Sequence, residues 1–370
     1  MAGMLQLNGR MRGALRALVP AALNIAGSHH DFDPLQRDGL CARCLRDWPD
    51  DPDFLPRWNE LLARNPWATA FLSPAWQSAA VKEFVPAGHF RLITVSRQRQ
   101  LLAVLPLALN GSSMLETPGS CVTDYLDPLV DSQAIVECWE MILRLLDELW
   151  DWSVCGVLLH QVRADSPLRQ ILPGLAPNFG FEYRETLAVK APCIVLPKSW
   201  DEYLASLDAH ERKEIKRKLR NAQTKANLQW LTIRDEAELV PALDRALAAM
   251  CQSESCKADF TDEVLVGFLR RLCPILARQG DFFLQELWLQ GKPSAWLLCL
   301  RSDRGPMIYN TGYEFAQRRW SPGIVSFSLA IQDAIAAGAP VFNLLRGTEE
   351  YKRRFGAQDL GLFNIQLLPS

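Results

Sequence analysis

The sequence has little net charge and few cysteines, and these two shortages exclude several classes of protein. Its 370 residues carry 40 lysines and arginines against 42 aspartates and glutamates, a formal net charge of −2. This balance gives no global attraction for a polyanion, so we expect no DNA partner. Ten cysteines are too few for a disulfide scaffold. They lie in apolar stretches such as those around Cys155 and Cys299, which predicts buried, reduced thiols in a cytoplasmic protein.

Metal-ligand spacing and long apolar runs are also missing. The close cysteine pairs are Cys41/Cys44 and Cys251/Cys256, and neither has a second cysteine or histidine pair at zinc-site spacing. We therefore expect no bound metal. No stretch reaches 18 uninterrupted apolar residues, so no transmembrane segment is predicted.

What the sequence does have is a pattern that occurs twice after residue 52. Each half contains helices, a three-stranded meander, a helix and a strand. In the first half, the predicted meander, helix and strand cover 89–95, 100–109 and 113–117, then 132–151 and 154–160. In the second half they cover 282–290, 295–301 and 306–312, then 322–337 and 340–345. This recurrence predicts an α+β fold of two tandem domains, 53–192 and 193–370, after a poorly ordered N-terminal extension, 1–52.

The start of the helix predicted at 322–337 is a candidate phosphate site. Ser321 is a favoured N-cap, Pro322 suits the first helical position, and Gly323 leaves the first turn open to close approach. Arg318 and Arg319 lie just upstream. Free N–H groups, the helix dipole and two cations together favour a phosphate. The alternative is an ordinary capped helix with a solvated arginine pair.

The motif Arg318-x-x-Ser321-x-Gly323 resembles the Gln/Arg-x-x-Gly-x-Gly/Ala pyrophosphate loop of the GNAT acyltransferase superfamily. It occupies the same place, between the third meander strand and the next helix. Ser321 stands where that superfamily usually has its first glycine.

A narrower resemblance is to the CelD/BcsL (cellulose biosynthesis) type of GNAT-like protein, which is related to the FemAB peptidyltransferases. Four elements carry it, in that branch's order: AFLSPAW (70–76), VTDYLDPLV (122–130), SLDAHERKEIKRKLRNAQ (206–223) and GTEEYKRRFG (347–356). Asn343 replaces the aspartate that commonly precedes the last element.

The resemblance implies two tandem GNAT-like domains, each with a mixed, largely antiparallel twisted sheet flanked by helices. The second domain would hold acyl-CoA as co-substrate, acetyl or longer, and the cleft between the domains would hold the acceptor. The reaction would be acyl transfer to an amine or hydroxyl of a small molecule, sugar or cell-envelope precursor, as in exopolysaccharide biosynthesis. The residues implied to bind acyl-CoA are Arg318, Arg319, Ser321, Pro322 and Gly323.

Candidate residues for the chemistry lie in two of these elements. Glu349 could accept the acceptor's proton and Tyr351 could return one to the leaving thiolate, although both could be structural. Lys352 is a candidate contact to phosphate or substrate, or a solvated lysine. Asp124 and Tyr125 lie in a turn-rich loop that could hold the acceptor, although Asp124 could equally form a local turn hydrogen bond.

Residues 210–225 contain seven basic and two acidic residues, a net charge of +5. A solvated helix face, a phosphate clamp and a tRNA-binding surface all fit this charge. The span 200–230 is too short for the long antiparallel arm of tRNA-using FemAB proteins, which makes tRNA the weaker hypothesis. The alternatives to acyl transfer are therefore an aminoacyl-tRNA-dependent FemAB-type transferase and a non-catalytic binding protein. The expected location is the cytoplasm, or peripherally at the inner membrane.

Overall fold

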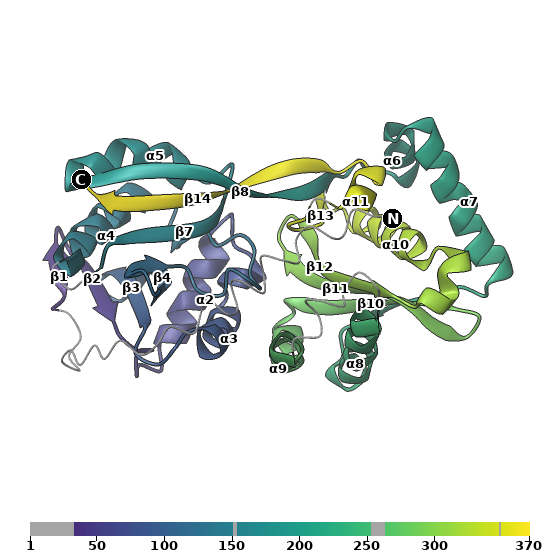
Figure 1. Cartoon of the computed structure of the whole chain (residues 1–370), viewed down its shortest axis with the longest axis horizontal. Helices are drawn as coiled ribbons and strands as arrows, with labels where there is room; N and C mark the ends of the chain where they lie inside the picture. The colour runs from purple at the N-terminus through teal and green to yellow at the C-terminus, as the bar shows by residue number, and fades with distance from the viewer. Residues whose placement is uncertain (1–32, 151–153, 253–262, 348) are drawn as a thin grey trace. The chain divides into compact units, whose positions relative to one another are not determined.

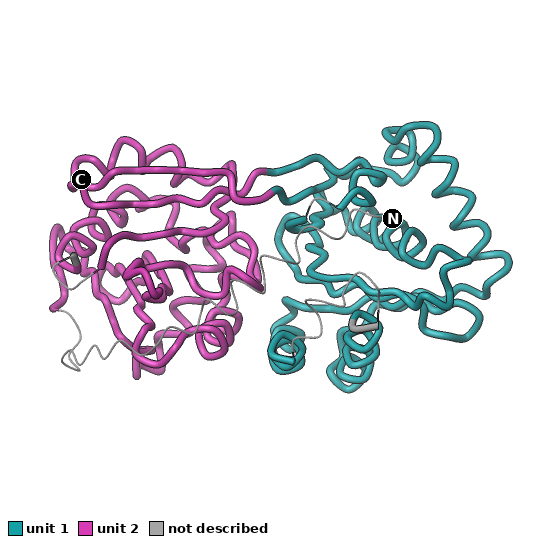
Figure 2. Tube along the Cα trace, in the orientation of Figure 1, with its two compact units in different colours: residues 1–12, 190–360 teal, residues 13–189, 361–370 magenta. Residues whose placement is uncertain are grey.

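The computed structural model describes residues 33–150, 154–252, 263–347 and 349–370, which form two compact units (Figures 1 and 2). The N-terminal unit comprises residues 33–189 together with 361–370 (magenta in Figure 2). The C-terminal unit comprises residues 190–360 (teal). Among the described helices, none is both long enough and apolar enough to cross a membrane.

Two long strands contribute residues to both units: β8 (Phe181–Val195) and β14 (Gln358–Pro369). The sequence placed the domain boundary at 192/193, which lies inside β8, and assigned 361–370 to the second domain. The structure instead places 361–370 in the N-terminal unit, because β14 pairs there with β7 (Gly156–Arg163). An apolar strand does not reveal from its sequence which sheet it will join.

The N-terminal unit contains the predicted meander, followed by a helix and a parallel strand. Its strand order is β1-β2-β3-β4-β5-β7-β14-β8, and β5 and β7 form its parallel pair. The further strands are β1 (Leu35–Arg37), β2 (Leu40–Leu45), β3 (Phe90–Arg97), β4 (Gln100–Leu109), β5 (Met114–Glu116) and β6 (Leu129–Val130). The helices are α2 (Phe54–Arg64), α3 (Pro74–Phe84), α4 (Ile135–Trp150) and α5 (Leu168–Leu175), with short 3-10 turns η1 (Ala70–Leu72) and η2 (Ala176–Phe179).

Part of the stretch predicted as a poorly ordered extension is folded. Residues 35–45 form β1 and β2, and β2 pairs along its whole length with β3. Leu40, Ala42 and Cys44 are buried in the core of the unit. Their alternation is a strand pattern, but the surrounding aspartates and arginines obscured it. Residues 1–32 lie outside the described part of the chain.

The C-terminal unit repeats the plan. Its strand order is β8-β13-β12-β11-β10-β9, with β12 and β13 parallel. The strands are β9 (Gln229–Ile233), β10 (Phe282–Leu289), β11 (Lys292–Ser302), β12 (Gly305–Tyr313) and β13 (Val341–Asn343). The helices are α6 (Trp200–Ser206), α7 (Ala209–Lys225), α8 (Glu236–Gln252), α9 (Glu263–Gln279), α10 (Pro322–Ala336) and α11 (Glu350–Arg354), with a 3-10 turn η3 (Phe315–Trp320). Within this unit, α7 and α10 cover one face of the sheet, and α8 and α9 cover the other (Figure 1).

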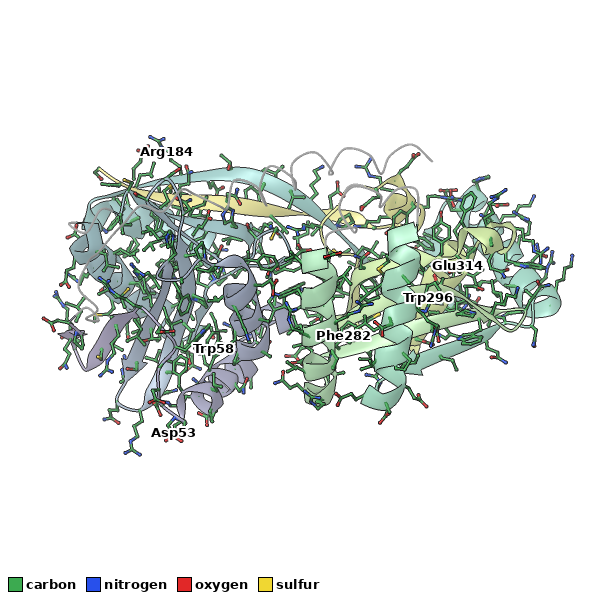
Figure 3. All side chains as sticks on the ribbon, turned by 60° about the horizontal axis from the view of Figure 1, so that its bottom comes forward. Asp53, Trp58, Arg184, Phe282, Trp296 and Glu314 are labelled. Carbon is green, nitrogen blue, oxygen red and sulfur yellow. The ribbon has the colours of Figure 1, made fainter. Side chains whose placement is uncertain are left out.

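Each unit has its own apolar core. Trp58 in the N-terminal unit and Trp296 in the C-terminal unit are both 1% exposed (Figure 3). Apolar side chains of α10, such as Val325 and Ile331, pack with Leu297 and Cys299 of β11. This packing fixes α10 against the sheet, and therefore fixes where its N-terminus begins.

The prediction of buried cysteines holds for four of the eight cysteines whose side chains the structure describes, and the others are half-buried or exposed. These eight cysteines of the described part of the chain are free thiols. Cys44, Cys138, Cys273 and Cys299 are buried. Burial raises the pKa of the Cys138 thiol to about 12, so it is unreactive at neutral pH. Cys155 was expected to be buried and is exposed, because it lies just before β7 begins at Gly156.

Candidate functional site

The predicted site residues fall into two groups, one in each unit. Eight of them, from Arg318 to Gly323 and from Glu349 to Lys352, lie in the C-terminal unit. Asp124 and Tyr125 lie in the N-terminal unit. Each group is described within its own unit.

The arginine pair lies on η3, the short turn that leads from β12 into α10. The Arg318 guanidinium stacks over the exposed Phe315 ring at 4.3 Å, and Arg319 donates a 2.6 Å hydrogen bond to Gln290 Oε1. Both side chains are exposed, yet each is oriented by a neighbour. Such orientation lowers the entropy lost when a guanidinium binds a phosphate.

Ser321 was predicted to cap α10, but its side chain does not do so. Its backbone is left-handed (φ 54°, ψ 52°), and its hydroxyl accepts no capping hydrogen bond. The chain has to turn sharply from η3 into α10 at this residue, and glycine adopts such a conformation most readily. The left-handed turn gives a physical reason for the glycine that related loops have at this position.

The first turn of α10 is otherwise as the sequence predicted. Pro322 is at the first helical position, and the N–H groups of Ile324 and Val325 both donate to the Ser321 carbonyl, at 3.0 and 3.1 Å. The Gly323 N–H, at the second position, has no intrahelical acceptor by geometry. A Cβ at Gly323 would meet only the Tyr313 ring, at 3.9 Å, so there is room beside this residue. The turn can therefore admit an anion close to the Gly323 backbone.

Glu349, Tyr351 and Lys352 form a half-buried cluster around α11. Lys352 is only 4% exposed, and its ammonium lies 2.9 Å from Glu349 Oε2 and donates to the Arg346 carbonyl at 2.9 Å. Of the two hypotheses for Lys352, the solvated lysine is therefore wrong, because a charge this deep requires partners. These two contacts direct the ammonium inward rather than toward solvent.

The Tyr351 ring packs against Phe327 of α10, with ring centroids 5.5 Å apart, so the α11 cluster adjoins the helix of the phosphate site. Burial, and then the charge of Glu349, raise the pKa of the Tyr351 phenol above its usual value. The phenol therefore stays protonated at neutral pH, and the same shift makes it a weaker acid than an exposed tyrosine.

Gly347 makes the position of the Glu349 carboxylate possible. Its φ of +127° lies in a region that residues with a side chain rarely adopt, and a Cβ there would lie 2.3 Å from Glu349 Oε2. Gly347 was not among the functional residues predicted from the sequence. Its place at the start of the GTEEYK element was the available signal.

In the N-terminal unit, Asp124 and Tyr125 belong to the segment between β5 and β6. Both side chains are 3% exposed, and Tyr125 has a left-handed backbone (φ 53°). Trp76 of α3 donates its indole N–H to Thr123 Oγ1 at 2.9 Å, which fixes Thr123, the residue before Asp124. Burial to this degree favours the structural alternative for Asp124 in the conformation described.

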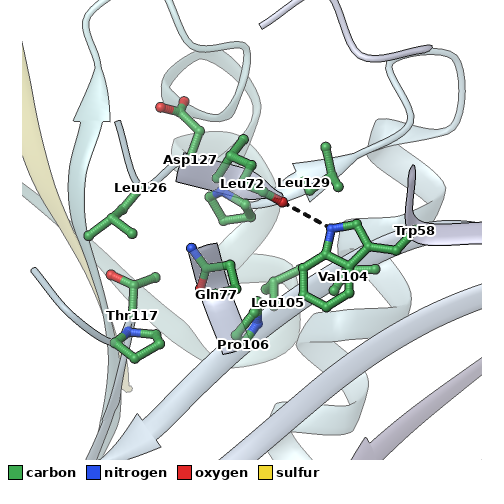
Figure 4. A pocket seen from close by; sticks show the side chains of 12 residues that line it. Trp58, Leu72, Gln77, Val104, Leu105, Pro106, Thr117, Leu126, Asp127 and Leu129 are labelled. Carbon is green, nitrogen blue, oxygen red and sulfur yellow. Dashed lines mark hydrogen bonds between the residues drawn. The ribbon is translucent and has the colours of Figure 1, made fainter. Parts of the chain in front are cut away.

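A small cavity lies beside the same segment (Figure 4). Its walls are mostly apolar, including Trp58 and Leu126, with Gln77, Thr117 and Asp127 as polar lining. Gln77 is 3% exposed, and its Oε1 has no hydrogen-bond partner among the described residues. No sequence signal predicted this cavity, although Asp127 lies in the same DYLDPLV element as Asp124.

We expect Asp127 to make the stability of the N-terminal unit depend on pH. Burial raises the pKa of this carboxyl above its usual value, although its contacts with Ser166 and Arg163 oppose the shift. Because the folded state holds this proton more tightly than the unfolded state, protonated Asp127 stabilises the fold. This stabilisation is complete below the unfolded-state pKa and is lost as pH rises through the folded-state pKa. We expect wild type to lose stability relative to Asp127→Asn between pH 4.5 and pH 7.5, measured by urea denaturation. An equal difference at both pH values would contradict this.

In the described part of the chain, no cluster of three or more His, Cys, Asp or Glu side chains is arranged to hold a metal ion. The C-terminal unit instead offers cations, a helix start and a buried phenol, which are groups for binding an anion and moving a proton.

One known family matches part of the chain, within the C-terminal unit. Residues 209–353 match the family described as acetyltransferase (GNAT) domain. This range contains α7, the meander, η3, α10 and nearly all of α11. It therefore includes every predicted site residue of the C-terminal unit. A comparison with curated proteins finds no match.

Solved structures share the fold at low sequence identity. The chain is similar to FemX (TM-score 0.61, 11% identity, 84% of this chain and 95% of that chain covered). It is also similar to a conserved protein of unknown function from Bacteroides thetaiotaomicron (TM-score 0.52, 13% identity, 85% and 97% covered). A third is a C-terminal domain from Agrobacterium fabrum described under the name lysylphosphatidylglycerol synthetase (TM-score 0.50, 10% identity, 84% and 90% covered).

These likenesses extend over both units. The chain thus has a mixed α+β fold with a largely antiparallel sheet, residues 209–353 match a GNAT domain, and the predicted fold class is confirmed. The resemblance to the CelD/BcsL type stays a prediction.

Proposed function

We propose that the protein transfers an acyl group from acyl-CoA to an amine or hydroxyl of a sugar or cell-envelope precursor. The observation that carries the proposal is the start of α10, where a left-handed turn joins the oriented Arg318 and Arg319 to the open backbone at Gly323. The match of residues 209–353 to an acetyltransferase domain supports it.

In this proposal the residues of the C-terminal unit have distinct roles. Arg318, Arg319 and the first turn of α10 bind the phosphates of acyl-CoA, which supplies the activated thioester. Tyr351 donates the proton of its hydroxyl to the leaving thiolate. Glu349 accepts the proton of the acceptor. Lys352 positions the Glu349 carboxylate through their ion pair rather than binding substrate in the conformation described.

Asp124 and Tyr125 remain the proposed acceptor contacts of the N-terminal unit. The segment that carries them would have to open for either side chain to reach a ligand, because both are buried. The CelD/BcsL assignment, the exopolysaccharide context and the cytoplasmic or peripheral membrane location belong to the same proposal.

The aminoacyl-tRNA alternative has less support from the chain itself. Residues 200–230 form a 7-residue α6, a 17-residue α7 and the start of β9, rather than two long antiparallel helices. The likeness to FemX concerns the fold alone at 11% identity. The second alternative, a non-catalytic binding protein, predicts that Arg318→Ala and Tyr351→Phe leave the cellular phenotype unchanged.

The proposal is tested by mass spectrometry of the purified protein for retained acyl-CoA. We expect a species heavier than the chain by one acyl-CoA under native conditions, removed by denaturation, with an acyl group that identifies the donor. A species carrying aminoacyl-tRNA instead would support the alternative and contradict the CoA assignment.

A further inference from the structure

The outer face of α7 carries a row of basic side chains. Lys213, Lys216 and Arg220 are exposed and follow one another at spacings of three and four residues, so they share one face of the helix. Ile215 and Leu219 lie on the opposite side and are buried in the core of the C-terminal unit. The row therefore points away from the core.

Neighbouring acids do not neutralise this row. Glu211 is bound by Arg354, with both carboxylate oxygens at 3.0 Å from Nε. Glu214 is bound by Arg217, at 3.0 and 2.8 Å, with Lys218 at 3.7 Å. Within the described residues, no ion pair is formed by the three residues of the row or by the two basic residues that flank it: Lys213, Lys216, Arg220, Arg212 and Lys225.

Like charges three and four residues apart on a helix repel one another. The helix keeps this arrangement because its opposite face, with Ile215, Leu219 and Ala222, is anchored in the core. That anchoring also means that α7 has no free apolar face to insert into another phase. Its outer face can therefore act as a rigid, purely electrostatic contact surface.

We propose that this face of α7 docks the protein on an anionic lipid surface. The charge complementarity of several unpaired cations with a layer of lipid phosphates carries the inference, since each such residue strengthens binding about fivefold. Single-stranded RNA fits less well, because it is bound through aromatic stacking in a basic groove, whereas residues 209–225 contain no phenylalanine, tyrosine or tryptophan. A base-paired RNA such as tRNA is an outcome that the test below separates from lipid. The inference does not depend on the proposed acyl transfer.

The test is co-sedimentation of the full chain with vesicles. One set is phosphatidylcholine with 30% phosphatidylglycerol, the other is phosphatidylcholine alone, each at 50 and 300 mM NaCl. The row variant is Lys213→Glu/Lys216→Glu/Arg220→Glu. The control is Lys82→Glu/Lys198→Glu/Lys292→Glu, which changes the net charge equally at three lysines elsewhere on the surface. Circular dichroism verifies that both variants fold.

We expect wild type to bind the anionic vesicles at least tenfold more strongly than the neutral ones at 50 mM NaCl, and to be released at 300 mM. The row variant should lose about 100-fold in affinity, and the control less than threefold. Equal binding to both vesicle types, or equal loss in both variants, would overturn the proposal. Retention of tRNA without retention of anionic vesicles would also overturn it, in favour of an RNA partner.

Discussion

Arg318→Ala is expected to weaken acetyl-CoA binding about 10- to 100-fold. Hydrogen bonds to charged groups contribute about 1.5–3 kcal/mol each, which corresponds to this range. Arg318 is exposed and stacks on the equally accessible Phe315, so its loss should leave the fold intact. The dissociation constants of wild type and variant, measured by equilibrium dialysis with labelled acetyl-CoA, give the comparison.

Arg270→Ala is the matched control for this prediction. Arg270 is an exposed arginine of the same unit, located on α9, which covers the other face of the sheet from α10, and it is paired with Asp244. We expect its dissociation constant to stay within twofold of wild type. If Arg318→Ala behaved like Arg270→Ala, a contact between Arg318 and the phosphates of acetyl-CoA would be excluded.

Gly347→Ala is expected to destabilise the C-terminal unit by about 3 kcal/mol or more. The new Cβ would occupy the place of the Glu349 carboxylate, and the backbone at φ +127° would be strained. Displacing that carboxylate would leave Lys352 buried without its anion, and breaking a buried pair in this way costs about 3–5 kcal/mol. Urea denaturation followed by tryptophan fluorescence measures the change in the free energy of unfolding.

Gly338→Ala separates the two contributions. Gly338 also has a positive φ, +72°, but a Cβ there would meet nothing within 4 Å. We expect a loss of only about 1–2 kcal/mol, from the backbone alone. Equal losses in the two variants would show that the contact with Glu349 contributes nothing.

The sequence was most informative where local chemistry and apolar periodicity agreed. The second meander and α10 were predicted within a few residues, because alternating apolar strands, the turn glycine Gly291 and the Ser-Pro-Gly helix start each restrict the backbone locally. The same holds for the order of elements in both halves. These signals depend on neighbours in the chain and not on the tertiary fold.

What the sequence did not reveal depends on contacts between distant residues or on backbone angles. Lys352 looks like part of a solvated basic run, and its burial follows from the Arg346 carbonyl and Glu349 closing over it. The left-handed Ser321 contradicts the usual behaviour of serine before a helix, because the geometry of the η3–α10 turn outweighs capping. Assignment of 361–370 required knowing the partner of β14.

Isothermal titration of the wild-type chain with acetyl-CoA and with longer acyl-CoAs tests the central claim most directly. The account predicts saturable binding of at least one of them at one site per chain, weakened when phosphate or high salt competes for the cations at Arg318 and Arg319. Absence of binding for every acyl-CoA, with a correctly folded protein, would contradict it.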